Sequence, residues 1–95
     1  MTRALRLASQ VTEYARRLAP EPRRMVRLAL KELKYERGDI RALETPLVGF
    51  YRLRVGRHRI IFTYAADGAI DAVFMEDRSL VYEVFEAEFI KKFST

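Results

Sequence analysis

The feature that most constrains this chain is the segment Phe50–Phe62, which reads FYRLRVGRHRIIF. It alternates apolar and charged side chains, a pattern typical of β-strands with one buried face. Its middle part, Tyr51–Arg59, contains four arginines and one histidine but no acid. Because like charges on one face repel each other, such a face either lies in solvent or binds a polyanion. The segment therefore indicates both a half-buried sheet and the class of partner to look for.

The residues before this segment indicate a short strand and two helices. Arg3–Leu7 alternates and predicts a strand with Leu5 and Leu7 facing inward. Ser9 is expected to cap the helix that follows, since its hydroxyl can accept a hydrogen bond from a free amide at the helix end. A break with two prolines separates this helix from a second one, which we expect Pro22 to open. The pattern predicts a hairpin of two antiparallel helices.

The remaining residues indicate a connecting loop, a meander and a last helix. The loop is expected over Asp39–Gly49, because it contains a proline and a glycine. Three antiparallel strands follow, over Tyr51–Val55, His58–Tyr64 and Ile70–Met75, with an Asp67-Gly68 hairpin turn. Ser79 is then expected to cap a helix whose aromatic residues recur every three to four positions: Tyr82, Phe85, Phe89 and Phe93. Residues 1–95 are thus predicted to form one α+β domain with a short N-terminal strand, helical hairpin, antiparallel β-meander and C-terminal helix.

Composition excludes several classes of protein. The 95 residues include no cysteine, so disulfide frameworks and thiolate metal sites are excluded, in keeping with a cytoplasmic protein. No apolar run approaches the length of a membrane span, and the first residues do not resemble a secretory signal. The net charge of +5 favours partners that are polyanions, chiefly nucleic acid or an acidic protein. We expect no metal or cofactor, because the acids Asp71, Glu76 and Asp77 have no accompanying histidine and generic spacing.

The segment PLVGFYRLRVGRHRIIF, followed by a strand and then RSLVYE, resembles the RelE/ParE superfamily of toxins from type II toxin–antitoxin pairs. The resemblance covers nearly the whole chain and implies the same fold. RelE-like members enter the ribosomal A site and cut messenger RNA, whereas ParE-like members inhibit DNA gyrase and cut no RNA. The resemblance therefore implies a messenger-cutting toxin, with a gyrase inhibitor as the alternative. A third possibility is an inactive toxin fold that survives as a partner of the antitoxin.

The resemblance also implies site residues. Five match the positions of the family's catalytic residues: Arg52, Arg54, Arg59, Arg78 and Tyr82. Strand alternation places the first three on one face, where guanidinium groups can stabilise a phosphorane formed by attack of the RNA 2′-hydroxyl. Tyr82 would take the proton, with nearby cations favouring its ionised form, and Arg78 would stabilise the leaving group. Four further basic residues are expected to contact RNA: Arg57, Arg27, Lys31 and Lys34.

The sequence departs from the family in one segment and leaves plainer interpretations open. Messenger-cutting relatives often have a basic residue just before the last helix, where this chain has Glu76-Asp77; this departure slightly favours the gyrase alternative. The arginine-rich strands are also compatible with a face that is merely solvated. The same holds for the basic stripe of the second predicted helix, which consists of Arg23, Arg27, Lys31 and Lys34. Tyr82 also fits as a core aromatic. His58 has the parity of Ile60 and is expected to be a packed histidine.

The expected partners follow from the family. The first is an antitoxin, which would cover the arginine face or displace the last helix and would form an oligomer with the toxin. The second is the ribosome with its messenger RNA. No membrane partner is expected.

Overall fold

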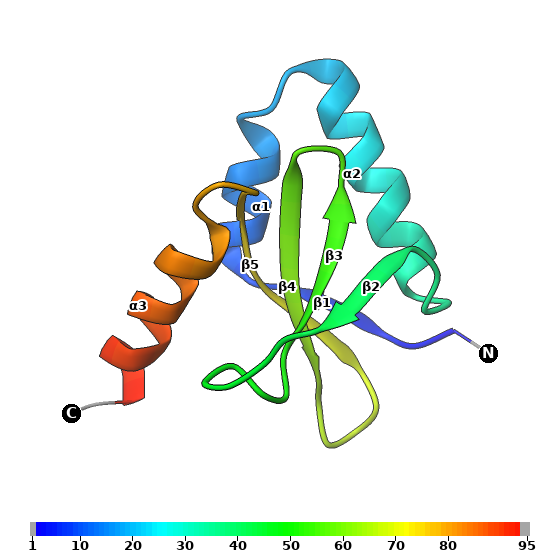
Figure 1. The fold of residues 1–95 in the computed structure, drawn as a ribbon. Helices are drawn as coiled ribbons and strands as arrows, with labels where there is room; N and C mark the ends of the chain where they lie inside the picture. The colour runs from blue at the N-terminus through cyan, green and yellow to red at the C-terminus, as the bar shows by residue number, and fades with distance from the viewer. Residues whose placement is uncertain (1, 94–95) are drawn as a thin grey trace.

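The structure is a computed structural model that describes residues 2–93, except for the side chains of Ile90, Lys92 and Phe93. Its elements are β1 (Leu5–Leu7), α1 (Ser9–Arg16), α2 (Pro20–Leu33), β2 (Asp39–Ala42), β3 (Tyr51–Val55), β4 (His58–Tyr64), β5 (Ile70–Asp77) and α3 (Val81–Phe93). The strands form one sheet in the order β1-β5-β4-β3-β2 (Figure 1). β1 is parallel to β5, and the other neighbouring pairs are antiparallel. The predicted α+β fold is confirmed.

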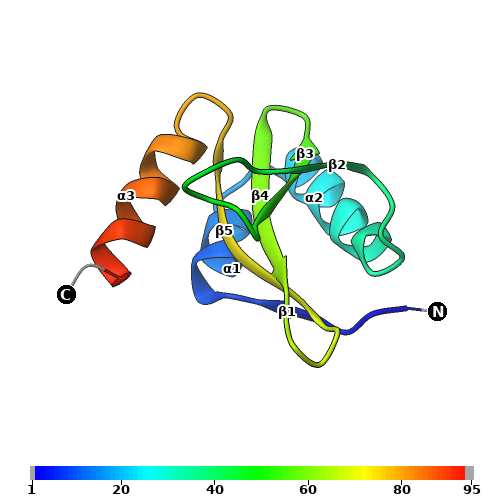
Figure 2. The ribbon, with the colours of Figure 1, turned by 60° about the horizontal axis from the view of Figure 1, so that its bottom comes forward.

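The sheet separates two hydrophobic clusters, one on each face. Because side chains alternate along β4, Ile60 and Phe62 belong to one cluster and Ile61 to the other. The first cluster is covered by α1 and α2, which contribute the buried residues Val11, Val26, Leu30 and Leu33. The second is covered by α3, through Val81 and Phe85. Figures 1 and 2 show α3 standing apart from the α1–α2 hairpin, with strands of the sheet between them.

Three details near the N-terminus differ from the sequence prediction. Leu7 is 43% exposed rather than buried, because β1 is a three-residue strand at the border of the sheet. Helix α1 begins at Ser9 itself, and Ala8 occupies the N-cap with no side-chain hydrogen bond. Helix α2 begins at Pro20 rather than Pro22. A proline is tolerated there because the amide that it lacks would have no partner in the first turn.

The segment predicted as a loop contains an additional strand. Asp39–Ala42 pairs with β3 as the opposite border strand, with Asp39 facing Arg54 and Arg41 facing Arg52. Its sequence, DIRA, has one large apolar residue, Ile40, which packs against the first cluster. A strand of four residues with one such side chain carries too little alternation to be recognised, so the loop prediction was wrong here.

Gln10 completes the border of β5 where β1 ends. β1 pairs with residues 70–72 only. Further along, Gln10 Nε2 donates to the Met75 carbonyl (2.7 Å), and Gln10 Oε1 accepts from the Met75 amide (2.8 Å). A side-chain amide offers the same donor and acceptor as a peptide group. At this position α1 therefore takes the place of a neighbouring strand. Within residues 2–93, none of the helices is long and apolar enough to cross a membrane.

Replacing Gly38 by alanine is expected to cost about 2–4 kcal/mol of unfolding free energy. Gly38 has φ +130°, and a Cβ there would lie 2.8 Å from Cδ1 of the buried Leu53. Gly49→Ala is the matched control, since Gly49 also has a positive φ (+100°) but open space around a Cβ. Urea denaturation of both variants measures the difference. Equal losses would show that the contact with Leu53 contributes nothing.

Stability is expected to fall between about pH 10 and about pH 12 because of Tyr64. Its hydroxyl donates to Glu36 Oε1 (2.8 Å), and Arg3 lies over its ring at 5.1 Å. Burial, and then this hydrogen bond, raise the pKa of Tyr64 to about 12. The unfolded phenol ionises near pH 10, so the unfolded chain loses its proton first as the pH rises. Urea unfolding at pH 8 and pH 11 should show a larger loss for wild type than for Tyr64→Phe; the same loss in both would contradict the assignment.

Candidate functional site: the basic face of the sheet

Arg54 and Arg59 lie directly opposite each other on β3 and β4. Arg52 lies opposite Ile61 in the same pair of strands. Opposed residues in an antiparallel pair project to the same side of the sheet, so all three arginines are on the face that α3 covers through Ile61, as the alternation predicted. Arg54 is exposed, with 54% of its side chain accessible. Arg59 is half-buried, and its NH1 donates to the carbonyls of Gly56 (2.9 Å) and His58 (3.0 Å).

Arg52 differs from these two because an acid of the protein holds it. Its side chain is only 10% exposed, and its NH1 lies 3.0 Å from both the carbonyl and Oδ1 of Asp39. The other oxygen of that carboxylate lies 4.0 Å from NH1 of Arg54. Asp39 is therefore the counter-ion of the basic face, although the sequence pattern predicted it to lie in a loop. The arrangement leaves Arg54 more accessible to an incoming phosphate than Arg52.

Arg57 and Arg78 lie at the end of the sheet where β4 begins and β5 ends. Arg57 occupies the β3–β4 turn, and its Nε donates to Asp77 Oδ1. Arg78 is exposed in the turn before α3, with its backbone amide donating to the Arg57 carbonyl (2.8 Å). Ser79 does not cap α3 with its hydroxyl as predicted, because that hydroxyl donates to Asp77 Oδ2 (2.6 Å).

The acids expected to weaken this end of the site are already engaged. Hydrogen bonds from Arg57 and Ser79 hold the pKa of Asp77 well below its usual range. Glu76 accepts the backbone amide of Asp77 at 2.9 Å. Asp77 is thus a neutralised partner of Arg57, and its charge is largely compensated before any phosphate arrives.

Tyr82 lies in the first turn of α3 and is 39% exposed. Its neighbours Val81 and Phe85 are the residues that enter the second cluster, together with the partly buried Phe89. The interpretation of Tyr82 as a core aromatic is therefore wrong. The predicted packing of Phe93 lies outside the described side chains.

The basic residues of the helical hairpin form a separate surface. Arg27 and Lys31 on α2 and Lys34 at its end are exposed. Helix α2 packs on the opposite face of the sheet from α3. The structure therefore does not bring these three residues together with Arg54 and Arg59 on one face.

His58 is packed, as its parity predicted. Its Nδ1 lies 3.1 Å from the Tyr14 hydroxyl, and the two rings meet edge to face. Burial lowers the pKa of His58. The ring therefore stays neutral at pH 7, and its packing against Tyr14 joins β4 to α1.

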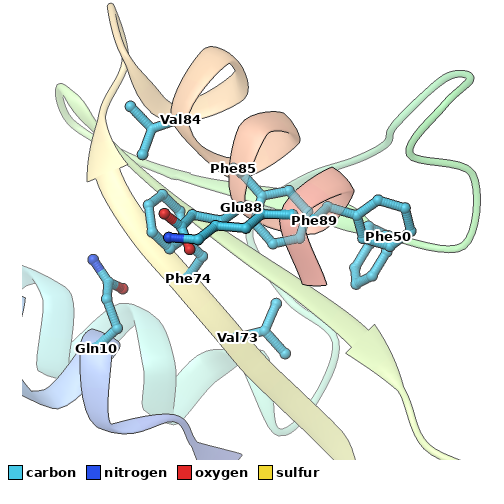
Figure 3. A pocket seen from close by; sticks show the side chains of 9 residues that line it. Gln10, Phe50, Val73, Phe74, Val84, Phe85, Glu88 and Phe89 are labelled. Carbon is cyan, nitrogen blue, oxygen red and sulfur yellow. The ribbon is translucent and has the colours of Figure 1, made fainter. Parts of the chain in front are cut away.

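A cavity of about 800 Å³ lies between α3, β5 and α1. Figure 3 shows that aromatic side chains converge on it, among them Phe50, Phe74, Phe85 and Phe89. The predicted catalytic and RNA-binding residues are not part of its lining. It is an apolar hollow beside the basic face and separate from it.

Solved structures with a similar fold include toxin chains from three complexes. A chain of the archaeal RelE–RelB complex from Pyrococcus horikoshii is 25% identical, with a TM-score of 0.68, over 82% of this chain and 97% of that chain. A chain of the RelB–RelE complex from Methanococcus jannaschii is 20% identical, with a TM-score of 0.66, over 84% of this chain and 98% of that chain. A chain of the RelBE2 complex from Mycobacterium tuberculosis is 17% identical, with a TM-score of 0.68, over 83% of this chain and 94% of that chain. No family model matches the chain, and no curated protein matches its sequence.

The fold and the basic face together define a small α+β protein whose sheet carries paired arginines on the side of its last helix. The chain is RelE-like in its fold, in agreement with the resemblance predicted from its sequence.

Proposed function

We propose that this protein is the toxin of a toxin–antitoxin pair and that it cleaves messenger RNA on the ribosome. The observation that carries the proposal is the direct opposition of Arg54 and Arg59 on a RelE-like sheet. The similar chains from P. horikoshii and M. jannaschii were solved in complex with RelB, an antitoxin in the second case. An antitoxin is accordingly the first partner to seek.

In the proposed reaction, the 2′-hydroxyl of the messenger attacks the adjacent phosphorus and the 5′-oxygen leaves. Negative charge develops on the phosphorane oxygens, and fixed cations stabilise it most where water is scarce. Arg54 and Arg59 supply these cations, and their planar guanidinium groups fit phosphate oxygens in pairs. Tyr82 accepts the proton of the attacking hydroxyl, Arg78 stabilises the leaving 5′-oxygen, and water protonates that oxygen as its bond to phosphorus breaks. The ribosome supplies the conformation of the messenger.

Arg52 has a supporting role in this proposal. Its guanidinium binds both the carbonyl and the carboxylate of Asp39, so it fixes β2 against β3. Arg57, Arg27, Lys31 and Lys34 are proposed to contact RNA backbone, with those on or next to α2 facing a different part of the ribosome.

The test is cleavage of messenger on translating ribosomes by the purified toxin. We expect cuts within the translated region by wild type and no cuts in the same messenger without ribosomes. Intact messenger on ribosomes would refute the proposal.

The alternative is a ParE-like inhibitor of DNA gyrase. It is favoured by one observation, the partial neutralisation of Arg52 and Arg54 by Asp39 and of Arg57 by Asp77. A gyrase supercoiling assay with the same protein distinguishes the two functions. Inhibited supercoiling together with intact messenger would establish the alternative.

A further inference from the structure

The carboxylate of Asp77 receives hydrogen bonds from both sides of the turn that leads into α3. Arg57 Nε donates to Oδ1 at 2.5 Å, while the backbone amide and hydroxyl of Ser79 donate to Oδ2 at 2.9 and 2.6 Å. The Asp77 side chain is only 17% exposed, although Arg57 is 66% exposed. An acid that accepts its own chain two residues on forms an Asx turn, which fixes the backbone of the residue between. That residue is Arg78.

The same turn is also tied to the β3–β4 hairpin. The amide of Arg78 donates to the carbonyl of Arg57 at 2.8 Å, and the amide of Leu80 closes the turn onto the Asp77 carbonyl at 3.0 Å. Arg57 thus holds the turn twice, by its backbone and by its side chain. It precedes β4 by one residue, and β4 carries Arg59 at its second position.

We propose that Asp77 is a positioning residue, whose carboxylate holds Arg78 beside the hairpin that carries Arg59. This inference rests on the proposed function, in which Arg78 acts on the leaving oxygen. Tyr82 does not depend on Asp77, because the buried Val81 and Phe85 anchor the start of α3.

The acid that departs from the family pattern thereby acquires a physical role. A negative charge near the phosphate would oppose catalysis if it were free. Here Arg57 compensates the charge of Asp77, and the same carboxylate fixes the backbone at Arg78. A displacement of a catalytic group by about 1 Å can cost about 100-fold in rate, so a turn with this many fixed contacts matters for the chemical step.

The first measurement is hydrogen exchange of the turn, which does not depend on any cleavage activity. Asp77→Ala is expected to speed exchange of the Ser79 amide by about tenfold or more, because that amide loses its acceptor. Exchange of the Arg78 amide should also speed up, because the side chain of Arg57 no longer holds the turn against the carbonyl that this amide binds. Asp71→Ala is the matched control: Asp71 also lies on β5, pairs with an arginine (Arg6), and changes the net charge equally. Unchanged exchange in Asp77→Ala would overturn the inference whether or not wild type cuts messenger.

The second measurement is single-turnover cleavage on ribosomes, where the wild-type rate tests the proposed function by itself. Asp77→Ala is expected to cut about 10- to 100-fold more slowly than wild type, with ribosome binding within about twofold. Asp77→Asn retains an oxygen acceptor for Ser79, so its cleavage rate should fall between the rates of wild type and Asp77→Ala. This variant also tests the inference if Asp77→Ala folds poorly.

A double-mutant cycle separates positioning from general stability. In an Arg78→Ala chain, Asp77→Ala should slow cleavage by no more than about threefold, since there is no guanidinium left to position. In a Tyr82→Phe chain it should keep its full effect. An equal effect of Asp77→Ala in both backgrounds would overturn the positioning role and leave Asp77 as a stabilising residue.

Discussion

Arg59→Ala is expected to slow messenger cleavage by about 100- to 1,000-fold, which corresponds to about 3–4 kcal/mol of transition-state stabilisation. Arg59 is half-buried, and two backbone carbonyls already orient its NH1. A cation held in this way loses little freedom when a phosphate binds, so most of its interaction with the developing charge lowers the barrier. Arg54→Ala should have a smaller effect, because its exposed guanidinium is more strongly screened by water and is shared with Asp39.

Single-turnover cleavage on translating ribosomes measures this effect, with ribosome binding assayed in parallel. Arg16→Ala is the matched control, since it removes the same charge from an exposed position on α1, on the far side of the sheet. We expect that control to cut within about twofold of wild type. Equal rates for Arg59→Ala and Arg16→Ala would remove Arg59 from the site, although the fold assignment would stand.

Phe62→Ala is expected to lower the free energy of unfolding by about 3–5 kcal/mol. Phe62 is fully buried in the first cluster, where it stacks on Tyr51 (5.5 Å between ring centroids) and meets Tyr64 edge to face (5.8 Å). Removing its ring leaves a cavity that the flanking strands cannot close, because their backbones are fixed by hydrogen bonds. Since domains of this size are stable by only about 5–15 kcal/mol, the loss is a large share of the total.

Urea denaturation followed by circular dichroism measures that loss. Val48→Ala provides the comparison, because Val48 is 70% exposed in the β2–β3 connection and its truncation should change stability by no more than about 0.5 kcal/mol. A Phe62→Ala loss as small as that of Val48→Ala would mean that the first cluster is not the stabilising core.

The elements with strong periodicity were predictable, and those at the borders of the sheet were not. The alternation in β3 and β4 correctly assigned Leu53 and Phe62 to one face and the arginines to the other. Strand β2 was missed because a border strand needs only one buried side chain, here Ile40, to pack. The start of α2 was displaced because two prolines fit its first turn equally well in the sequence.

The candidate site was predictable in its residue types but not in its internal contacts. Parity alone placed Arg54 and Arg59 on one face, and the register then made them direct neighbours. Nothing in the local pattern pairs Arg52 with Asp39, because their contact depends on a strand that the sequence did not reveal. The same holds for Asp77, whose partner Arg57 is twenty residues away and reaches it only through the β4–β5 pairing. Long-range partners of this kind become visible only when the register of the sheet is known.

The side chain of Gln10, bonded to both backbone groups of Met75, bears on how this protein behaves at high concentration. An open row of peptide groups along a sheet recruits strands from other molecules and starts fibril growth. Here the side chain of Gln10 occupies the peptide groups of Met75, in the part of β5 that β1 is too short to pair with. Copies of this chain are therefore expected to stay separate at this border, rather than to pair strand to strand through it.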